Sequence, residues 1–584
     1  MCGIFAVVGN TINQDKVDAA LSTLRRRGPD DMGSLAFSGC TLAQTRLAIV
    51  DLTLGGHQPM QDARAPHAIT FNGEIYNYKE LRRDLENKGH IFQSDSDTET
   101  ILKAYTEYGE RCVEHLDGMF AFALWDSEKK KMFLARDRFG KKPLYYATDA
   151  SGVLVIASEI KALIAYGIQP NIDPRGIDAY LALMYLPPTM TFFSNVHTLP
   201  PAHTATYEGN MLKTHRYWKL EEVSPLTISY EEAKEETRRL FTAAVKKRMI
   251  ADVEIGAFLS GGVDSTLITS YAQKMTDHPI KTFSLGYGDY INELPFADEA
   301  ARVINTDHRT LQVHTVLIPE LEALMAHLDE PHADSANLAQ SVLSEFTSKH
   351  VKVALAGDGG DELFMGYGWY WAYHNRPKLI TLKNSIFSNQ MSEHIKSITV
   401  FPASLRKHLM RARIEGSNNL IPPSVAVMTT HDAHQINAYD LAMYLPGQLL
   451  TKVDRTSMMH SLEVRCPLLD SDLAMFAYAL PLDYKIDKST GKFILKDLLA
   501  EIMPRSFVDR KKQGFGAPVR KWLKEETMQK YVRGKFGNNA RIFGHLDQER
   551  TQAFVQTTLS GNDQKSYYRL WVLLCLELWL ETHS

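Results

Sequence analysis

Apolar and polar residues follow two different patterns along this chain, and the change falls near residue 230. The first part is dominated by short apolar or alternating runs typical of β-strands. In the second part, strand-like apolar runs are separated by stretches with helical spacing, which predicts a parallel sheet with crossover helices. The expected strands are 2–9, 67–71, 119–125, 131–135, 153–157, 254–259, 281–286 and 351–356.

Chain breakers separate the two parts. Pro200-Pro201, Glu208-Gly209-Asn210 and Ser224-Pro225 are typical of turns and linkers, and an amphipathic helix is expected directly after them, over 230–249. A chain of 584 residues is too long for a single hydrophobic core. We therefore expect a first domain over 2–205, a linker over 206–228 and a second domain over 229–584.

Composition narrows the class of protein. Hydrophobic residues make up 44% of the chain and charged residues 23%, as in folded soluble proteins, and the net charge of −4 provides no general attraction to nucleic acid. Five cysteines without Cys-x-x-Cys spacing argue against disulfides and zinc and for a reducing, cytoplasmic setting. The apolar segment 568–580 contains Arg569 and Glu577 and is too short to span a bilayer, so we expect a buried helix and no membrane association.

A glycine- and serine-rich loop follows the expected strand 254–259. It reads Ser260-Gly261-Gly262-Val263-Asp264-Ser265 and runs directly into a helical pattern. Backbone N–H groups, hydroxyls and the helix N-terminus can together surround a phosphate. The loop lacks the lysine of a Walker sequence. An anion-binding loop is therefore predicted, and the alternative is a turn that only closes a strand–helix corner.

A second, acidic loop follows the expected strand 351–356. It reads Gly357-Asp358-Gly359-Gly360-Asp361. In a parallel sheet it would lie beside the first loop, at the carboxyl ends of the strands. Carboxylates beside phosphates require a cation, and Mg²⁺ is bound through few carboxylates plus phosphate oxygens. The alternative interpretation is a solvated turn.

Cys2 stands at the start of the first expected strand. Removal of Met1 would leave it with a free α-amine, whose pKa of about 7.7–8.0 suits a base at neutral pH. Nucleophile and base would then belong to one residue. By itself, a cysteine at this position could equally be a small buried hydrophobic residue.

Four further segments accompany Cys2 within the first hundred residues: Arg27–Asp30, Arg46–Asp51, Asn72–Asn77 and Ser96–Glu99. In this order the set resembles the glutaminase domain of N-terminal-nucleophile (Ntn) amidotransferases, over about residues 2–205. The resemblance implies an αββα fold with Cys2 as the nucleophile. It also implies an oxyanion hole from Asn72 and Gly73, a carboxylate ligand in Arg46, and ammonium ligands in Glu74 and Asp97. Taken singly, these residues could form a turn, a surface ion pair and a helix cap.

The second part resembles the ATP pyrophosphatases, which cut ATP between its α- and β-phosphates. Together with 452–455, 463–470 and 510–515, its loops are similar to those of glutamine-dependent asparagine synthetases. The resemblance implies a Rossmann-like parallel-sheet domain with added helices, Mg²⁺ on Asp264 and Asp361, Asp358 near the reacting carboxyl, and Lys512 stabilising phosphate charge. The implied ATP-binding residues are Leu259, Ser260, Gly261, Gly262, Asp264, Ser265, Leu285 and Gly357.

The resemblance further implies glutamine, aspartate and ATP as substrates, with a β-aspartyl-AMP intermediate and release of AMP and pyrophosphate, and it leaves a homodimer open. Residues 335–337 depart from the family pattern near the expected acceptor site. The alternative acceptor is therefore another carboxylate, such as a uronic acid of a surface polysaccharide or a natural-product intermediate. This chain lacks the clustered basic face expected of an enzyme that acts on tRNA. A non-catalytic binding protein would have no need for the complete set of site residues.

Overall fold

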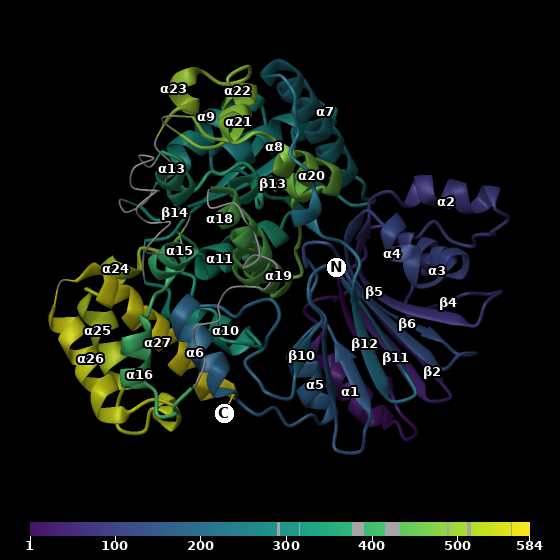
Figure 1. The fold of residues 1–584 in the computed structure, drawn as a ribbon, viewed down its shortest axis with the longest axis horizontal. Coiled ribbons are helices and arrows are strands. Elements are labelled where there is room, and N and C mark those ends of the chain that lie inside the picture. Colours follow the sequence, from purple (N-terminus) through teal and green to yellow (C-terminus); the bar gives the residue numbers. More distant parts are fainter. Residues whose placement is uncertain are drawn as a thin grey trace.

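A computed structural model of the chain describes residues 1–288, 292–314, 316–375, 390–414, 433–487, 490–510, 516–561 and 563–583. The two-sheet sandwich of the N-terminal part and a larger, mostly helical part lie side by side (Figure 1). The N-terminus lies at the centre of this view, where the two parts meet. The chain's first residues are therefore close to both.

The N-terminal part contains two six-stranded antiparallel sheets. The first has the order β10-β8-β9-β1-β3-β2 and the second β12-β11-β7-β6-β5-β4. The expected strands 2–9, 67–71, 119–125, 131–135 and 153–157 are confirmed as β1, β5, β6, β7 and β9. The strand bounds are β1 Cys2–Val8, β2 Asp31–Phe37, β3 Cys40–Arg46, β4 Met60–Gln61, β5 His67–Ile75, β6 Gly118–Asp126, β7 Lys131–Arg136, β8 Tyr145–Thr148, β9 Leu154–Ala157, β10 His197–Thr198, β11 His203–Glu208 and β12 Met211–Arg216.

Apolar side chains hold this part together in layers. Ile4 and Ala6 of β1 pack against Ala121 and Ala123 of β6 between the two sheets. Helices cover the outer faces: α1 and α5 lie on the first sheet, α2 and α3 on the second. This arrangement is the αββα sandwich that the sequence predicted. The helix bounds are α1 Gln14–Thr23, α2 Tyr78–Asn87, α3 Asp97–Tyr108, α4 Cys112–His115, α5 Ile160–Tyr166 and α6 Pro174–Leu183.

The second sheet extends into the range expected to be a linker. Strands β11 and β12 form a hairpin, and β11 pairs with β7 from Thr204 to Tyr207. Sheet pairing therefore continues to Arg216, well inside 206–228. The breaker Glu208-Gly209-Asn210 is the turn of this hairpin, because Gly209 and Asn210 both adopt the positive φ angles that a tight turn requires.

The C-terminal part is built on a five-stranded parallel sheet of order β15-β14-β13-β16-β17. The predicted strands 254–259, 281–286 and 351–356 are its β13, β14 and β16, and helices α7 and α8 pack beside it. The predicted helix 230–249 is α7, which begins at a capping box between Ser229 and Glu232. The strand bounds are β13 Ile255–Phe258, β14 Lys281–Gly286, β15 Asp307–Gln312, β16 Val353–Leu355 and β17 Glu463–Arg465.

Many helices surround this sheet. Their bounds are α7 Tyr230–Arg248, α8 Val263–Gln273, α9 Leu294–Ile304, α10 Ile318–His327, α11 Ala336–Ser348, α12 Gly360–Leu363, α13 Gly368–His374, α15 Gln390–Ile398, α16 Ala403–Leu409, α18 Ala433–Tyr439, α19 Thr451–Met458, α20 Ser471–Ala479, α21 Leu482–Lys485, α22 Phe493–Leu499, α23 Arg505–Val508, α24 Val519–Trp522, α25 Glu526–Lys535, α26 Gln548–Ser560 and α27 Gln564–His583. A π-helical turn spans Asp440–Leu450 between α18 and α19.

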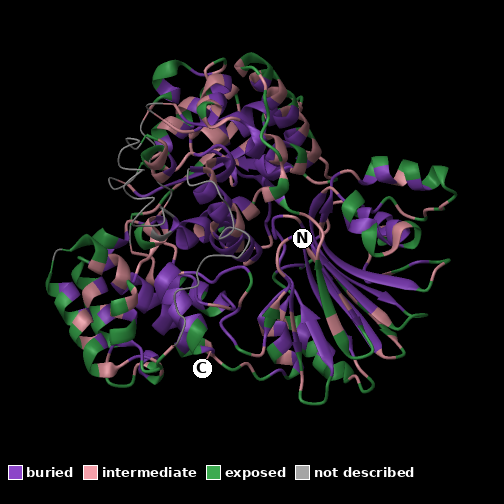
Figure 2. Cartoon of the chain, viewed as in Figure 1, coloured by how far each residue is buried: buried purple, intermediate pink, exposed green. Residues whose placement is uncertain are grey.

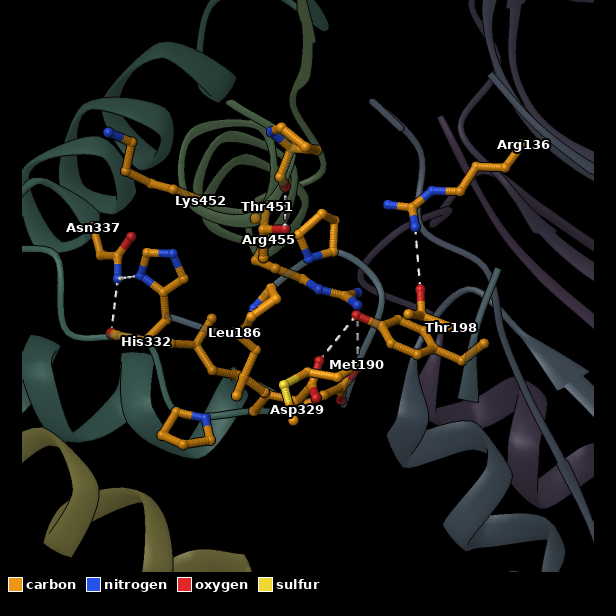
Figure 3. A pocket seen from close by; sticks show the side chains of 18 residues that line it. Arg136, Leu186, Met190, Thr198, Asp329, His332, Asn337, Thr451, Lys452 and Arg455 are labelled. Carbon is orange, nitrogen blue, oxygen red and sulfur yellow. Dashed lines mark hydrogen bonds and ion pairs between the residues drawn. The ribbon is translucent and has the colours of Figure 1, made fainter. Parts of the chain in front are cut away.

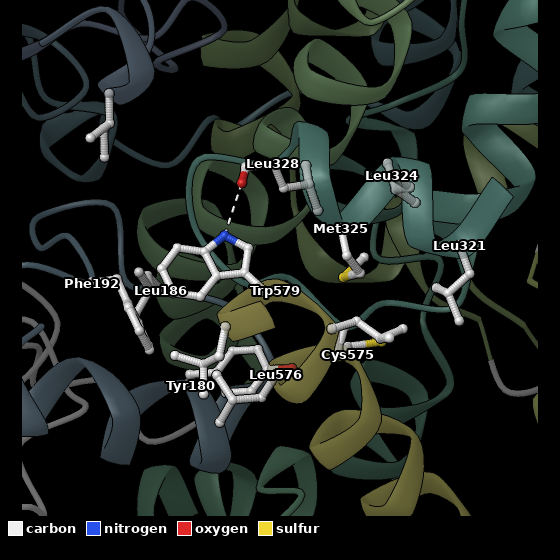
Figure 4. Packing of buried hydrophobic residues seen from close by; sticks show 14 of the residues in the cluster. Tyr180, Leu186, Phe192, Leu321, Leu324, Met325, Leu328, Cys575, Leu576 and Trp579 are labelled. Atoms are coloured by element: carbon white, nitrogen blue, oxygen red, sulfur yellow. Dashed lines mark hydrogen bonds between the residues drawn. The ribbon is translucent and has the colours of Figure 1, made fainter. Parts of the chain in front are cut away.

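The last helix, α27, is buried as the apolar segment 568–580 predicts. Trp579 packs edge-on against Phe192 with ring centroids 5.0 Å apart, and its indole N–H donates to Leu328 O at 2.9 Å (Figure 4). Helices α10 and α6 complete this core. In Figure 2 most strands and the helices of this core are largely buried, while exposed residues lie mainly at the periphery and along β12. Within the described ranges, the structure contains no helix long and apolar enough to cross a membrane.

Candidate active sites

The first site surrounds Cys2 at the start of β1. Its backbone N–H donates to Asn72 Oδ1 at 3.0 Å, and Arg27 Nε donates to its carbonyl oxygen at 3.1 Å. The Nδ2 amide of Asn72 is buried and has no hydrogen-bond partner among the residues that the structure describes. A buried free donor is costly unless a ligand uses it. Next to a thiol, such a donor can stabilise an oxyanion.

Gly73 lies beside Asn72 against the backbone of β6. A Cβ atom there would meet Met119 O at 2.0 Å, so no other residue fits without moving the strand. The close approach keeps the backbone of residues 72 and 73 in place beside Cys2. Both residues of the predicted oxyanion hole are therefore held by β5.

The ionisation of Cys2 is governed by its surroundings. Burial raises the pKa of the thiol, and the α-ammonium of Met1, 3.2 Å from Glu463 Oε2, acts in the opposite direction. In the structure the nitrogen of Cys2 is a peptide amide bonded to Met1. It becomes a base only when Met1 is removed.

The predicted glutamine ligands lie around the same thiol. The charges of Arg46 and Glu74 act on Cys2, and Asp97 acts on Glu74. Burial raises the pKa of Glu74 well above its usual range and that of Asp97 to about 6. The guanidinium of Arg46 donates to Asp51 O at 2.5 Å and to Val50 O at 3.1 Å. These carbonyls hold the guanidinium in place.

Two charged residues of the C-terminal sheet also reach this site, and the sequence analysis did not identify them. Arg465 Nη2 lies 3.5 Å from Glu74 Oε1, and Glu463 pairs with the α-ammonium. Both are fully buried on β17. Their signal in the sequence is the alternation Glu463-Val464-Arg465, which places two charges on one face of a strand in a buried sheet.

The second site begins at the loop between β13 and α8. Ser260 Oγ and Ser265 Oγ lie 3.1 Å apart, and the Gly262 N–H donates to Ser260 Oγ at 3.3 Å. Gly261 has φ +69°, and a Cβ there would meet the backbone of Phe296 at 2.6 Å. Hydroxyls, N–H groups and the N-terminus of α8 converge here, as a phosphate site requires. Leu259, at the start of the loop, accepts a hydrogen bond from Ser284 Oγ of β14, the strand that also carries Leu285.

The acidic loop after β16 packs directly onto this first loop. A Cβ on Gly357 would meet Asp264 Cβ at 2.9 Å, and one on Gly360 would meet Asp264 Cγ at 2.6 Å. The glycines thus allow Asp264 to approach Asp361. The two predicted magnesium ligands therefore belong to one site. The described residues contain no group of three or more His, Cys, Asp or Glu side chains able to hold a metal, so a cation here would be shared with phosphate oxygens.

Lys492 joins these two aspartates and was missed by the sequence analysis. Its Nζ forms an ion pair with Asp264 Oδ2 and lies 2.9 Å from Asp361 Oδ1. Burial disfavours the ammonium, but the two carboxylates raise the pKa of Lys492. The residue has φ +59° at the N-cap of α22. A lysine, rather than Ser, Thr, Asp or Asn, just before a helix was the available signal. The predicted Lys512 lies outside the described residues.

Asp358 lies in the same loop, close to charges of both signs. Burial raises its pKa, with Asp264 and Asp361 acting in the same direction and Lys452 opposing them. Lys452 in turn pairs with Asp334 at 3.2 Å. The segment 329–337, near which the sequence placed the acceptor, therefore adjoins Asp358 through Lys452.

A small cavity lies where the two parts of the chain meet. It has a volume of about 40 Å³, room for a few molecules of the size of water. Arg136 and Thr198 line it from the N-terminal part, and Lys452 and Asn337 line it from the C-terminal part, with Arg455 between them (Figure 3). The Oδ1 atom of Asn337 has no hydrogen-bond partner among the described residues.

A chain of ion pairs connects the cavity to Cys2. Arg455 Nη1 lies 3.2 Å from Glu159 Oε1, and Glu159 shares Arg27 with Asp454. Arg27 is the residue that donates to the carbonyl of Cys2. The cavity is thus connected to the first site through Arg27 and to the second through Lys452.

Comparison with known proteins agrees with this two-site architecture. A family described as asparagine synthase matches residues 236–581, and a glutamine amidotransferase domain matches residues 1–218. A Bacillus subtilis protein named as a glutamine-hydrolysing asparagine synthetase is 29% identical, over 99% of this chain and 96% of its own length.

Two other relatives extend the comparison. A Mycobacterium bovis protein provisionally named as an asparagine synthetase is 32% identical over 99% of this chain and 97% of its own. An amidase of Gibberella zeae is 26% identical, over 94% of each chain. The chain therefore belongs to the asparagine synthase family and is an ATP-dependent, glutamine-hydrolysing ligase with an N-terminal amidotransferase domain.

Proposed function

We propose that this enzyme hydrolyses glutamine at Cys2 and transfers the ammonia to the β-carboxylate of aspartate, which ATP has converted to β-aspartyl-AMP. The products are asparagine, glutamate, AMP and pyrophosphate. The observation that carries the proposal is the presence, in one chain, of a thiol beside a free amide donor and an anion-binding loop beside two aspartates and a lysine.

In the first reaction, the Cys2 thiolate attacks the side-chain amide carbonyl of glutamine, forms a γ-glutamyl thioester and releases ammonia. Water then hydrolyses the thioester to glutamate and frees the thiol. With Met1 removed, the α-amine accepts the thiol proton and returns it to the departing ammonia. The oxyanion that forms receives hydrogen bonds from Asn72 Nδ2 and the Gly73 N–H. Arg46 would bind the substrate's carboxylate, and Glu74 and Asp97 its ammonium.

In the second reaction, the acceptor carboxylate attacks the α-phosphate of ATP and pyrophosphate leaves. Activation is needed because a carboxylate oxygen is a poor leaving group, whereas AMP is a good one. The loop from Leu259 to Ser265 and Gly357 would hold the phosphates, with Leu285 near the adenine. Lys492 would neutralise phosphate charge during adenylate formation and breakdown. Mg²⁺, held by Asp264 and Asp361 when bound, would supply further neutralisation of the phosphates.

Ammonia has to travel from Cys2 to the adenylate without being protonated by bulk water, because ammonium lacks a nucleophilic lone pair. The cavity lined by Arg136, Asn337 and Lys452 supports such a route, since residues of both parts of the chain line it and its volume suits molecules like ammonia. Lys512 was expected to assist at the adenylate and remains a prediction from the sequence.

A second acceptor class is favoured by one observation. Lys452, a cation whose charge acts on Asp358, is paired with the buried carboxylate of Asp334, so it would have to leave that partner to bind the α-carboxylate of aspartate. Another carboxylate, such as a uronic acid or a natural-product intermediate, would not require that cation. Relatives named as amidases are consistent with such a shift in acceptor.

The test measures pyrophosphate and AMP from ATP with Mg²⁺ and glutamine, across a panel of aspartate, glutamate, uronic acids and aryl carboxylic acids. Stimulation by aspartate with formation of asparagine supports the main proposal. Stimulation by another acid alone supports the second acceptor class. Release of ADP instead of AMP would contradict both.

The Asp264→Asn variant tests the role of this carboxylate in the same assay. It should stop pyrophosphate release with glutamine or with ammonium as nitrogen source, because it removes one of the two carboxylates at the phosphate site. Glutamine hydrolysis should continue in this variant. If the variant still releases pyrophosphate, the assignment of Asp264 to the proposed phosphate site is wrong.

A further inference from the structure

Strand β17 belongs to the nucleotide-binding sheet, yet its side chains line the glutamine site. Glu463 and Arg465 occur at alternate positions, so both point to the same face of the strand. Arg465 and Glu463 are completely buried. Two buried charges on an edge strand need specific partners.

Arg465 has partners in both parts of the chain. Its Nε donates to Glu463 Oε1 at 2.6 Å, and its Nη1 donates to the carbonyls of Arg248 and Ile250 at 2.9 and 2.6 Å. Only Nη2 is left without a hydrogen bond among the described residues, and it points to Glu74 Oε1 at 3.5 Å. The guanidinium is thus fixed on one side and open toward the glutamine site.

The contact between Arg465 Nη2 and Glu74 lies at the proposed binding site for the ammonium of glutamine. Glu74 is the carboxylate proposed to bind the ammonium of glutamine. Without substrate, Arg465 and the α-ammonium of Met1 favour the ionised form of Glu74, while burial, Glu463 and Asp97 disfavour it. When the substrate ammonium arrives, it becomes a further cation beside Glu74 and competes with Arg465 Nη2 for that carboxylate.

The backbone of β17 connects this competition to the second site. Leu355 of β16 pairs with Arg465, and the Ala356 N–H donates to Arg465 O at 2.9 Å. Gly357 and Asp358 follow Ala356 directly in the chain. A shift of Arg465 is therefore one hydrogen bond away from the loop that carries Asp358 and Asp361.

We propose that Arg465 is a positioning residue that couples the two sites: the ammonium of glutamine competes with Arg465 Nη2 for Glu74, and β17 passes the response of Arg465 to the Gly357–Asp361 loop, whose affinity for nucleotide changes. The inference rests on the proposed function, because it assigns glutamine to the site at Glu74. Coupling of this kind is reciprocal, so nucleotide changes glutamine affinity by the same factor.

The experiment measures glutamine binding by calorimetry in the Cys2→Ala background, which prevents hydrolysis. Titrations are made with and without Mg²⁺ and an ATP analogue whose α- and β-phosphates are joined by a methylene group. We expect the two dissociation constants to differ by at least about fivefold. Arg465→Gln should bring their ratio to about one, because it removes the charge that competes with the ammonium for Glu74. Nucleotide titrations with and without glutamine should give the same ratio.

Lys352→Gln is the matched control. Lys352 forms an ion pair with Asp30 at 2.7 Å across the same interface, without contact to Glu74, so this variant should keep the full ratio. Arg465→Lys keeps the charge and should retain more coupling than Arg465→Gln. If Arg465→Gln does not fold, Glu463→Gln removes the carboxylate that Arg465 Nε binds, and the ratio of the two dissociation constants should then also be about one.

Several outcomes would overturn the inference. A ratio of one in the Cys2→Ala background shows no coupling, and an unchanged ratio in Arg465→Gln assigns the coupling to other residues. The proposed function is tested separately, by glutamine-dependent AMP release from the unmodified enzyme. If that reaction occurs while the ratio is one, only the coupling is wrong.

Discussion

Lys492 shows how a single residue can connect two loops that are distant in sequence. Its ammonium lies between Asp264 and Asp361, and its left-handed backbone follows Gly491, where a Cβ would meet Met365 O at 2.0 Å. Non-glycine residues with positive φ cost free energy and persist where the surroundings require them. The strained position of Lys492 is consistent with a role that depends on its charge.

Replacement of Lys492 by methionine tests this role. Two buried carboxylates would face each other without a cation, so the free energy of unfolding in magnesium-free buffer should fall by about 3–5 kcal/mol. Mg²⁺ should restore part of the loss, and AMP formation should drop sharply. Urea denaturation with and without Mg²⁺ measures the effect on stability. Equal stability of the variant and the unmodified enzyme would exclude Lys492 as the partner of these aspartates.

The buried imidazole of His332 is expected to make the stability of the protein depend on pH. Burial lowers its pKa from 6.5 to about 4. Its Nε2 lies 3.2 Å from Gln448 O, and its Nδ1 lies 2.9 Å from the Asn337 amide nitrogen. This pairing suits a neutral ring with the proton on Nε2. A second proton on Nδ1 would point at the Asn337 donor.

The consequence for stability has a definite sign. Below pH 6.5 the unfolded chain binds a proton that the folded His332 does not. The free energy of unfolding therefore decreases as the pH falls from 6.5 to about 4, and above pH 6.5 this residue causes no further change. Over that range we expect a slope of about 1.4 kcal/mol per pH unit from this group. His332→Gln keeps a donor for Gln448 and should remove that slope. Urea midpoints measured between pH 4.5 and 8 provide the test, and an unchanged slope would contradict it.

At the scale of elements, the buried helix α27 packs against α10, α24, α25 and α26. Its indole at Trp579 fills the space beside Phe192 and pairs with Leu328 O. Glu577, the charge that interrupts the apolar segment, accepts hydrogen bonds from the N–H groups of Arg541 and Ile542 at 2.9 and 2.7 Å. A charged residue can therefore be buried in this helix because it caps a neighbouring turn.

Truncation of Trp579 to alanine should lower the free energy of unfolding by about 3–5 kcal/mol, because it leaves a cavity and an unpaired carbonyl. Trp579→Phe keeps an aromatic ring and loses the indole hydrogen bond, so a smaller loss of about 1–3 kcal/mol is expected. Chemical denaturation of both variants measures the difference. Equal losses would mean that packing against Phe192 contributes little.

At the scale of the whole molecule, two sites share one interface. Arg27, fully buried, joins the carbonyl of Cys2 to Glu159 and Asp454. Residues from Cys2 to Asp454 thus meet in one network. This arrangement separates the source of ammonia from its use, while keeping both within a continuous structure.

Cys2→Ala tests the division of labour between the sites. Glutamine-dependent product formation should fall at least about 10³-fold, because the nucleophile is lost. Synthesis with added ammonium salts should continue, because the nucleotide site is unchanged. Cys112→Ala, a buried cysteine of the same part of the chain, should keep both activities. Loss of both activities in Cys2→Ala would show that the thiol and the nucleotide loop act in one site.

The sequence by itself was sufficient for the architecture and for the motifs of the two proposed sites. Strand periodicity predicted the two sheet systems, and the glycine-rich loops after β13 and β16 marked the proposed phosphate site, because local chain geometry requires glycine at these positions. The boundary at residue 205 was less well determined, since the turn at Gly209–Asn210 has the same composition whether it belongs to a linker or to a hairpin.

Only the tertiary structure showed which distant charges meet. Lys492 reaches Asp264 across more than two hundred residues, and Arg465 reaches Glu74 from the other part of the chain. The residues carry local signals, but the sequence does not show which partners they meet, because an ion pair between side chains depends on how the sheets and loops pack and not on local spacing. The sequence therefore determined the elements and the chemical groups they carry, while packing decided which of these groups act together.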